Sequence, residues 1–194
     1  MNNFKIIKNL PILDLYSEFQ RLLDEKIISW YVQPNGKPIE DQICVNTISG
    51  HNDDIHLGRG SLIYDWDKFS HDNNGNLHAP FRQQKMQESD FTVLCTQFKN
   101  TLFEQMFEEV TKNYQVGRIR IMNSRPKTCL TWHVDNTHRI HYPLKTQEGC
   151  LMVIEDEVRH LEKHTWYYTD TLKKHTAFNG SKEERLHLVV SILK

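Results

Sequence analysis

Hydrophobic positions recur at helical spacing in two parts of the N-terminal half. The first run predicts an amphipathic helix between Leu13 and Ile28, with these apolar positions: Leu15, Phe19, Leu22, Leu23 and Ile27. The second predicts a helix from about Phe91 to Lys112, capped by Ser89 or Asp90. Its apolar stripe is typical of a face buried in a core: Leu94, Phe98, Leu102, Phe103, Met106 and Val110.

The pattern changes to short β-type runs after Gly117. These runs predict strands at Arg118–Met122, Leu130–Val134, Arg139–Leu144, Cys150–Ile154, Thr165–Tyr168 and Leu186–Leu193. Turn-prone pieces such as Asn179-Gly180-Ser181 separate them. Because no helical run lies between these strands, they favour an antiparallel sandwich or barrel over a parallel sheet.

The stretch between the two predicted helices has little periodicity. Gly50 to Pro80 is rich in Asn, Asp, Gly and His, which predicts a long loop. A loop of this length in a compact domain is often a lid or a binding loop, and disorder is the alternative interpretation.

Length and composition indicate one globular domain. The 194 residues suffice for a single core, and 38% hydrophobic with 25% charged residues excludes a disordered chain. We predict a single domain, 1–194, in which a helical and loop-rich part (1–116) packs on a metal-binding β core (117–194). The net charge of −1 gives no indication of a nucleic-acid partner.

Cysteine spacing and hydropathy exclude several other classes. The four cysteines are scattered without a Cys-X-X-Cys pair, so neither a zinc ribbon nor a disulfide framework is indicated. The start of the chain has no signal-peptide core, and no stretch approaches the ~20 apolar residues of a membrane span. We therefore expect a cytoplasmic protein, whose oligomeric state the sequence does not indicate.

Three side chains form a candidate metal site. Residues two apart on a strand point to the same face, so His133 and Asp135 converge if Trp132-His133-Val134-Asp135 ends a strand. His175 comes later, ahead of the turn at Asn179, and an antiparallel crossing can return it beside this pair. Two histidines and a carboxylate are the ligands of non-haem iron(II) oxygenases, in which other positions stay open for cosubstrate and O₂.

The ligand types leave the chemistry open. Zinc hydrolases also use two histidines and a carboxylate, so a zinc or manganese hydrolase or isomerase on a cupin-like barrel is one alternative. Another is a non-catalytic jelly-roll module that binds a sugar or a peptide. The hydrolase or isomerase predicts no need for Arg185, and the binding module predicts no stoichiometric metal.

Arginines favour the oxygenase. Arg185 opens a largely apolar strand, where a guanidinium is costly unless it meets an anion such as the 5-carboxylate of 2-oxoglutarate. Pairing with Glu183 or Glu184 at the strand edge is the alternative. Arg139 and His141 share a strand face, from which both can contact the cosubstrate or the substrate carboxylate. The alternative is that they form a solvent-facing edge.

The same segments resemble a known family. Arg118-Ile119-Arg120, His133-Val134-Asp135, Arg139-Ile140-His141-Tyr142-Pro143-Leu144, His175-Thr176-Ala177-Phe178-Asn179 and Arg185-Leu186-His187-Leu188 resemble, in order and spacing, the aspartyl/asparaginyl β-hydroxylases, which are 2-oxoglutarate oxygenases. The resemblance spans about residues 117 to 193. It implies a double-stranded β-helix, a jelly roll of two sheets, with helices flanking a mainly β fold.

The resemblance also implies cofactors and roles. His133 and His175 map onto the histidine ligands of iron(II), and Arg185, Arg139 and His141 map onto positions that bind 2-oxoglutarate. The animal β-hydroxylases lack the carboxylate ligand, whereas this chain has Asp135, as do bacterial and phage members, some of which hydroxylate free proline. We therefore predict a dioxygenase that uses iron(II), 2-oxoglutarate and O₂ to hydroxylate a small-molecule or peptide substrate.

Overall fold

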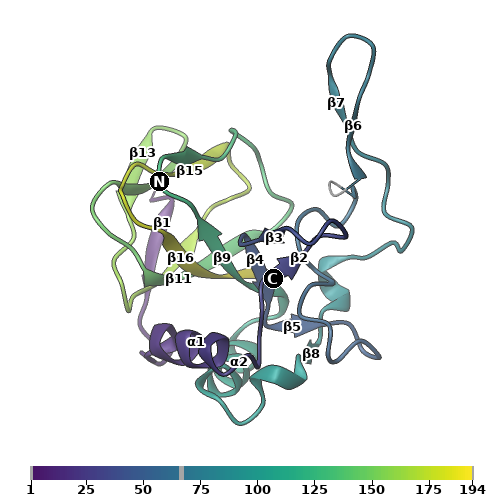
Figure 1. Ribbon diagram of the computed structural model, residues 1–194. Coiled ribbons are helices and arrows are strands. Elements are labelled where there is room, and N and C mark those ends of the chain that lie inside the picture. The colour runs from purple at the N-terminus through teal and green to yellow at the C-terminus, as the bar shows by residue number, and fades with distance from the viewer. Residues whose placement is uncertain (1, 66–67, 194) are drawn as a thin grey trace.

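Two antiparallel sheets form the body of the structure (Figure 1), a computed structural model that describes residues 2–65 and 68–193. Within this part of the chain, the larger sheet has six strands in the order β1-β14-β11-β16-β9-β4. They are β1 (Phe4–Ile7), β14 (Trp166–Thr169), β11 (His138–Lys145), β16 (Arg185–Ile192), β9 (Val116–Ser124) and β4 (Gln42–Cys44). The smaller sheet contains β10 (Thr128–Cys129), β15 (His175–Asn179), β12 (Cys150–Ile154) and β13 (Glu157–His160), in that order.

The chain passes back and forth between the two sheets from β9 onward. Strands β9, β11, β14 and β16 lie in the larger sheet, and β10, β12, β13 and β15 lie in the smaller one. Every pairing among these strands is antiparallel. This order is that of a double-stranded β-helix, so the predicted jelly roll is confirmed.

Alternation along the strands gives the larger sheet two different faces. On β16, every second residue from Leu186 to Ile192 belongs to the main hydrophobic cluster. The alternate residues Arg185, His187 and Val189 line a cavity between the two sheets. One face of the sheet is therefore an apolar packing surface, and the other is a charged cavity wall.

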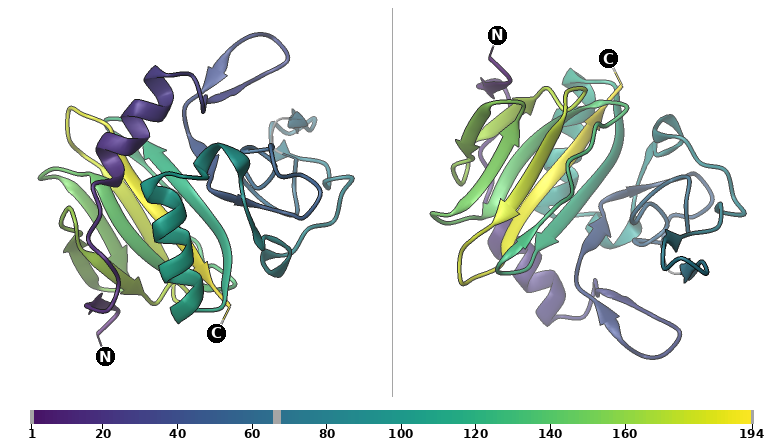
Figure 2. Two further views of the ribbon diagram at one scale, coloured as in Figure 1. Left: turned by 90° about the horizontal axis from the view of Figure 1, so that it is seen from below. Right: turned by 90° about the horizontal axis from the view of Figure 1, so that it is seen from above.

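Two helices cover the apolar face. Helices α1 (Leu15–Asp24) and α2 (Leu102–Asn113) lie across the larger sheet on the side away from the smaller one (Figure 2). Phe19 of α1, Met106 of α2 and Leu188 of β16 are fully buried in the cluster that joins the three elements. This packing is the main hydrophobic core, and a second, smaller cluster contains residues of both sheets.

The first predicted helix is confirmed, with tighter ends. Asp14 caps α1 by accepting a hydrogen bond from the Ser17 backbone N–H at 3.2 Å. The helix ends before Lys26, which has a positive φ of 58°. The backbone N–H of Ile27 then donates to the Leu22 carbonyl oxygen. A residue in the left-handed region stops a helix, and the spacing of apolar residues does not reveal it.

The predicted start of the second helix is wrong. Helix α2 begins at Leu102 rather than near Phe91, and its cap is Thr101 rather than Ser89 or Asp90. The preceding residues form the short strand β8 (Val93–Leu94), which pairs with β5 (Asn46–Thr47), and the 3₁₀ turn η3 (Thr96–Phe98). The apolar residues Leu94 and Phe98 are buried in the core without belonging to an α-helix, and their spacing resembles that of a longer helix.

Most predicted strands are confirmed, but the one at Leu130–Val134 is reduced. Strand β10 ends at Cys129, and the chain then keeps a single bridge to β15, between His133 and His175. Strands β13 and β15 and the edge strands β1 and β4 were not predicted. They are short or carry polar residues, so they have no clear period-2 pattern.

The predicted loop at Gly50–Pro80 holds a projecting hairpin. Strands β6 (Ser70–His71) and β7 (Leu77–His78) form this hairpin, which extends away from the body (Figure 1). A second small hairpin, β2 (Tyr31–Val32) with β3 (Pro38–Ile39), lies earlier in the chain. Residues 66 and 67 lie outside the described residues. None of the helices in the described ranges has the length and apolar composition needed to cross a bilayer.

Truncating Leu188 tests the helix–sheet core. We expect Leu188→Ala to lower the free energy of unfolding by about 2–5 kcal/mol, because it leaves a cavity between β16 and the helices. Urea unfolding followed by circular dichroism measures this change. Leu77→Ala is the matched control, since Leu77 is 50% exposed on β7, and it should change stability by less than about 0.5 kcal/mol. Equal effects of the two substitutions would contradict this account of the core.

Candidate active site

A cavity of about 1000 Å³ lies between the inner faces of the two sheets. Its walls come from β9, β11 and β16 on one side and from β12, β15 and the 130–137 segment on the other. Segments of the N-terminal part, around Gln42, Ser61 and Glu88, also contribute to its lining. The cavity is therefore built jointly by the β core and the part of the chain that precedes it.

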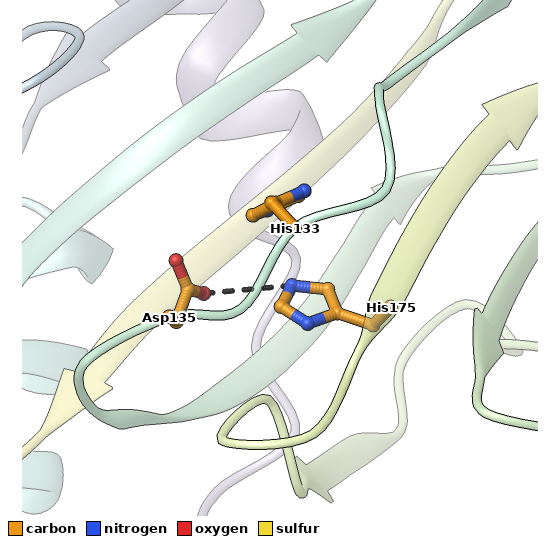
Figure 3. A group of neighbouring side chains, drawn as sticks. All are labelled: His133, Asp135 and His175. Atoms are coloured by element: carbon orange, nitrogen blue, oxygen red, sulfur yellow. Dashed lines mark ion pairs between the residues drawn. The ribbon is translucent and has the colours of Figure 1, made fainter.

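The three predicted metal ligands meet in this cavity. The ligand atoms of His133, Asp135 and His175 all lie within 4.8 Å of one another (Figure 3). The His175 Nε2 atom is 3.6 Å from Asp135 Oδ2, and the centroids of the two imidazole rings are 4.2 Å apart. The backbone bridge between His133 and His175 fixes this arrangement, because it holds the 130–134 segment against β15.

Hydrogen bonds orient both imidazoles. Nδ1 of His133 is 2.7 Å from the Thr131 carbonyl oxygen, and Nδ1 of His175 is 2.9 Å from the Lys173 carbonyl oxygen. Because a carbonyl can only accept, each Nδ1 carries the proton and donates it. Each Nε2 is then the unprotonated nitrogen, which is the form that binds a metal ion.

Protonation states also suit a metal. Burial lowers the pKa of His175, which favours the neutral imidazole. Burial alone would raise the pKa of Asp135, but the charge and the hydrogen bond of Arg139 outweigh it and lower the pKa, so the carboxylate is ionised. Two imidazoles that present Nε2 and one ionised carboxylate fit a divalent cation, since metal ligands must be deprotonated.

Arg139 connects the candidate ligands to the N-terminal part. Its Nε donates to Asp135 Oδ2 at 2.9 Å, and its Nη1 donates to Ser191 and, at 3.4 Å, to Glu88 Oε1. Glu88, on the 3₁₀ turn η2 (Glu88–Asp90), also forms a 2.8 Å ion pair with Arg118. An uninterrupted series of charge pairs thus runs from Asp135 through Arg139 and Glu88 to Arg118.

Close packing holds Glu88 and Arg118 in place. The Arg118 Nη1 group donates to the carbonyl oxygens of Gly58 and Gly60, both at 2.7 Å. A Cβ at Gly117 would lie 2.8 Å from the Cβ of Glu88, so only glycine permits η2 to approach β9 this closely. The Glu88 side chain is consequently 14% exposed and paired with two guanidinium groups.

A cluster of buried nitrogen atoms occupies another part of the cavity wall. Within the described residues, Arg185 forms no ion pair with a carboxylate, and its hydrogen-bond partner is the ring of His187, at 3.0 and 3.1 Å. Both ring nitrogens of His141 are buried without a hydrogen-bond partner. Burial lowers the pKa of His141 to about 3 and that of Arg185 to about 10, so the imidazole is neutral and the guanidinium charged at pH 7.

Unsatisfied buried groups of this kind indicate a missing partner. A buried cation without a counter-ion and an imidazole without hydrogen bonds are both costly in a protein interior. An anion with several oxygen atoms would satisfy both. The cluster therefore fits a carboxylate of 2-oxoglutarate, and the alternative pairing of Arg185 with Glu183 or Glu184 does not occur.

Arg120 is a second buried guanidinium of this type. Its residue is 6% exposed, its Nη1 donates to Gln42 Oε1 at 2.9 Å, and its Nε has no hydrogen-bond partner. Burial, with smaller contributions from the charges of Arg118 and Arg139, lowers its pKa to about 9. Within the described residues it forms no ion pair with a carboxylate.

All six residues singled out in the sequence lie in this cavity: His133, Asp135, His175, Arg139, His141 and Arg185. Sequence reasoning missed Glu88, because it lies far from the motifs and reaches them only through tertiary packing. It also assigned no role to Arg118 and Arg120. The sequence contains a signal for these two residues, because arginines alternate with apolar residues on β9. Arg185 has the same kind of apolar neighbours on β16.

Comparisons with known proteins give one family and a set of partial structural likenesses. The model of the aspartyl/asparaginyl beta-hydroxylase family matches residues 42–194. No curated protein matches the chain.

The structural likenesses are of low identity. A cupin domain from Bordetella pertussis is 18% identical, with a TM-score of 0.35, over 40% of this chain and 81% of that one. A 2OG-Fe(II) oxygenase family oxidoreductase from Burkholderia pseudomallei is 17% identical, with a TM-score of 0.37, over 46% of this chain and 48% of that one. AerE from Microcystis aeruginosa is 21% identical, with a TM-score of 0.36, over 40% and 36% of the two chains.

The ion pair of Glu88 makes stability depend on acid pH. Burial would raise the pKa of Glu88, but hydrogen bonds and charge from Arg118, together with the charge of Arg139, lower it from 4.5 to about 2. A folded-state pKa below the unfolded one stabilises the protein above about pH 4.5, and this contribution is lost as the pH falls towards about 2. We expect Glu88→Gln to be destabilising at pH 7 and much less so at pH 3, as measured by urea unfolding.

Glu25→Gln is the control for this titration. Glu25 follows the last residue of α1, is paired with Arg21 and has 49% of its side chain exposed. Glu25→Gln should therefore change the free energy of unfolding little at either pH. A Glu88→Gln penalty of the same size at pH 7 and pH 3 would contradict the ionised, buried pair.

Proposed function

The chain belongs to the aspartyl/asparaginyl β-hydroxylase family of iron(II)- and 2-oxoglutarate-dependent oxygenases, and we propose that it hydroxylates an unactivated C–H bond of an amino acid or a peptidyl residue. Family membership favours this reaction over the hydrolase, isomerase and non-catalytic alternatives. The substrate and the carbon that is hydroxylated are part of the proposal.

The observation that carries the proposal is the pairing of two incomplete sites in one cavity. Three ligand atoms of the right types converge without completing a coordination sphere. In the same cavity wall, Arg185 and His141 are buried without the anion that would satisfy them. A molecule with a metal-chelating end and a distal carboxylate would satisfy both sites together, and 2-oxoglutarate is such a molecule.

The proposed roles follow from these contacts. His133, Asp135 and His175 hold iron(II), and Arg185 pairs with the distal carboxylate of 2-oxoglutarate while His141 donates a hydrogen bond to the same carboxylate. When bound, iron(II) with 2-oxoglutarate and O₂ supplies the oxidising power for hydroxylation, with succinate and CO₂ as coproducts. The protein contributes the geometry, the charge pairing and a cavity from which water is displaced.

Arg139 acts on the ligand set as well as on the cosubstrate. Its Nε donates to Asp135 Oδ2 at 2.9 Å, the oxygen that lies 3.6 Å from His175 Nε2, and this contact restrains the carboxylate. Such second contacts raise metal affinity by restricting the ligand to its binding orientation. The prediction that Arg139 also contacts 2-oxoglutarate is compatible with its place in the cavity wall.

Metal binding tests the ligand assignment. We expect the wild type to bind iron(II), or zinc(II) as a redox-inert substitute, in a stoichiometric amount, and His175→Ala to lose this binding because one of three ligands is removed. Isothermal titration calorimetry under anaerobic conditions measures both. His71→Ala is the matched control, since His71 is exposed on β6, and it should bind metal like the wild type. Unchanged metal affinity in His175→Ala would refute the assignment.

Succinate formation tests the role of Arg185. In air, with iron(II) and ascorbate, we expect the wild type to form succinate from 2-oxoglutarate, and Arg185→Met to raise the 2-oxoglutarate KM. Losing a charge-assisted pair costs about 1.5–3 kcal/mol, which corresponds to a roughly 10- to 100-fold higher KM. Arg21→Met, an exposed substitution on α1, should leave the KM unchanged. An unaltered KM in Arg185→Met would contradict the assigned role.

A further inference from the structure

Glu88 is not one of the three candidate metal ligands, yet its carboxylate meets the arginine that holds one of them. Its Oε1 accepts a hydrogen bond from Arg118 Nη2 at 2.8 Å and another from Arg139 Nη1 at 3.4 Å. Its Oε2 accepts from the backbone N–H of Arg118 at 2.9 Å. The shorter contacts with Arg118 anchor the carboxylate on β9, so Arg139 faces a negative charge that is held in place.

Arg139 is restrained from more than one side. Its Nε donates to Asp135 Oδ2, and its Nη1 donates to both Ser191 Oγ and Glu88 Oε1. A guanidinium is planar and rigid, so contacts made at Nη1 also set the direction in which Nε points. Glu88 and Ser191 therefore orient the group that restrains the carboxylate of Asp135.

Charge gives Glu88 a second effect on Asp135. The positive charge of Arg139 weakens the attraction of Asp135 for a divalent cation, because opposite charges in a buried pair offset each other. Glu88 places a negative charge on another side of Arg139 and offsets it in turn. Among the described residues that line the cavity, the remaining carboxylate is that of Asp41, which pairs with Arg59 at 2.8 Å. Glu88 is therefore the lining carboxylate that can restore negative charge near the metal ligands.

We propose that Glu88 is a positioning residue for the metal site: it orients Arg139 and offsets its charge, so that Asp135 keeps both its orientation and its attraction for a divalent cation. This inference rests on the proposed function, because it takes Asp135 as a metal ligand. It makes the turn η2, in the N-terminal part of the chain, a determinant of metal affinity. A purely structural role would affect stability alone, whereas this role changes the metal affinity of the folded protein.

Zinc(II) titration measures this dependence. Contacts that support a metal ligand typically change metal affinity by about 10- to 100-fold, and we expect Glu88→Gln to raise the zinc(II) Kd by about that factor. Isothermal titration calorimetry at pH 7 gives the Kd, and circular dichroism shows whether the variant is folded. Glu88→Asp keeps the negative charge and should bind zinc(II) more tightly than Glu88→Gln. An unchanged zinc(II) Kd in folded Glu88→Gln overturns the proposal.

A double-mutant cycle tests whether the effect passes through Arg139. Arg139→Met removes the connection between Glu88 and Asp135. Glu88→Gln should therefore change the zinc(II) Kd of Arg139→Met much less than it changes that of the wild type. Equal changes in the two backgrounds would mean that Glu88 acts on the site by another route, and they would overturn the proposal.

Leu188→Ala is the control for a loss of stability. This substitution is destabilising, but Leu188 lies on the apolar face of β16, so the variant should bind zinc(II) like the wild type. A zinc(II) Kd raised as much in Leu188→Ala as in Glu88→Gln would make the effect of Glu88 one of general destabilisation and would overturn the proposal.

Glu88→Asp takes the place of Glu88→Gln in the cycle if the latter does not fold. Its side chain is one methylene shorter, so the carboxylate should lose the 3.4 Å contact with Arg139 before the 2.8 Å contact with Arg118. We then expect Glu88→Asp to raise the zinc(II) Kd of the wild type but not that of Arg139→Met. A zinc(II) Kd that Glu88→Asp leaves unchanged in the wild type overturns the proposal.

Failure of the proposed function gives a different result from failure of this inference. If the wild type binds no zinc(II), the ligand assignment fails, and the role of Glu88 fails with it. If the wild type binds zinc(II) and His175→Ala does not, the ligand assignment stands. An unchanged zinc(II) Kd in Glu88→Gln then refutes the role of Glu88 alone.

Discussion

The burial of four arginines on one face of a β-sheet is the constraint on which this structure depends. Arg118, Arg120, Arg139 and Arg185 all lie on the inner face of the larger sheet, each less than a tenth exposed. Burying a charge without compensation costs several kcal/mol, so the fold has to supply counter-ions or leave room for them. It does both, because two carboxylates neutralise part of the charge and the remaining guanidinium groups line an open cavity. The apolar packing of the opposite face against α1 and α2 offsets the free-energy cost of burying these charged side chains.

The N-terminal part is required for the site because it provides partners that the jelly roll lacks. Glu88 comes from a 3₁₀ turn, Gln42 from an edge strand, and the carbonyl groups that receive Arg118 come from Gly58 and Gly60. Through Arg139, Glu88 is also connected to a candidate metal ligand. The eight core strands bring the ligands together, whereas the preceding segments decide which arginines are neutralised. Variation in those segments would change the charge inside the cavity without altering the ligands.

The sequence predicts the β core well because its strands depend on local alternation. A period of two residues identifies β9, β11, β12, β14 and β16, whereas His133 and Asp135 lie outside a strand and meet His175 through the isolated bridge to β15. The start of α2 was mispredicted because residues before Leu102 are buried through tertiary contacts at spacings that resemble a helix. Glu88 was missed for a related reason: nothing in its own neighbourhood distinguishes it from a surface glutamate. Partners that meet only through the fold leave no periodic signal.

Val189 separates two buried polar side chains on the inner face of the larger sheet. It is the apolar residue between Arg120 and His141 in the row that crosses β9, β16 and β11, and on β16 it follows the inward-facing Arg185 and His187. Like charges repel each other, and the repulsion is strong where little water screens it. Arg120 lies on the neighbouring strand, whereas Arg185 precedes Val189 on β16 itself, so the two guanidinium groups enter the cavity wall at different places. This separation makes the repulsion between them smaller than in a single cluster of arginines.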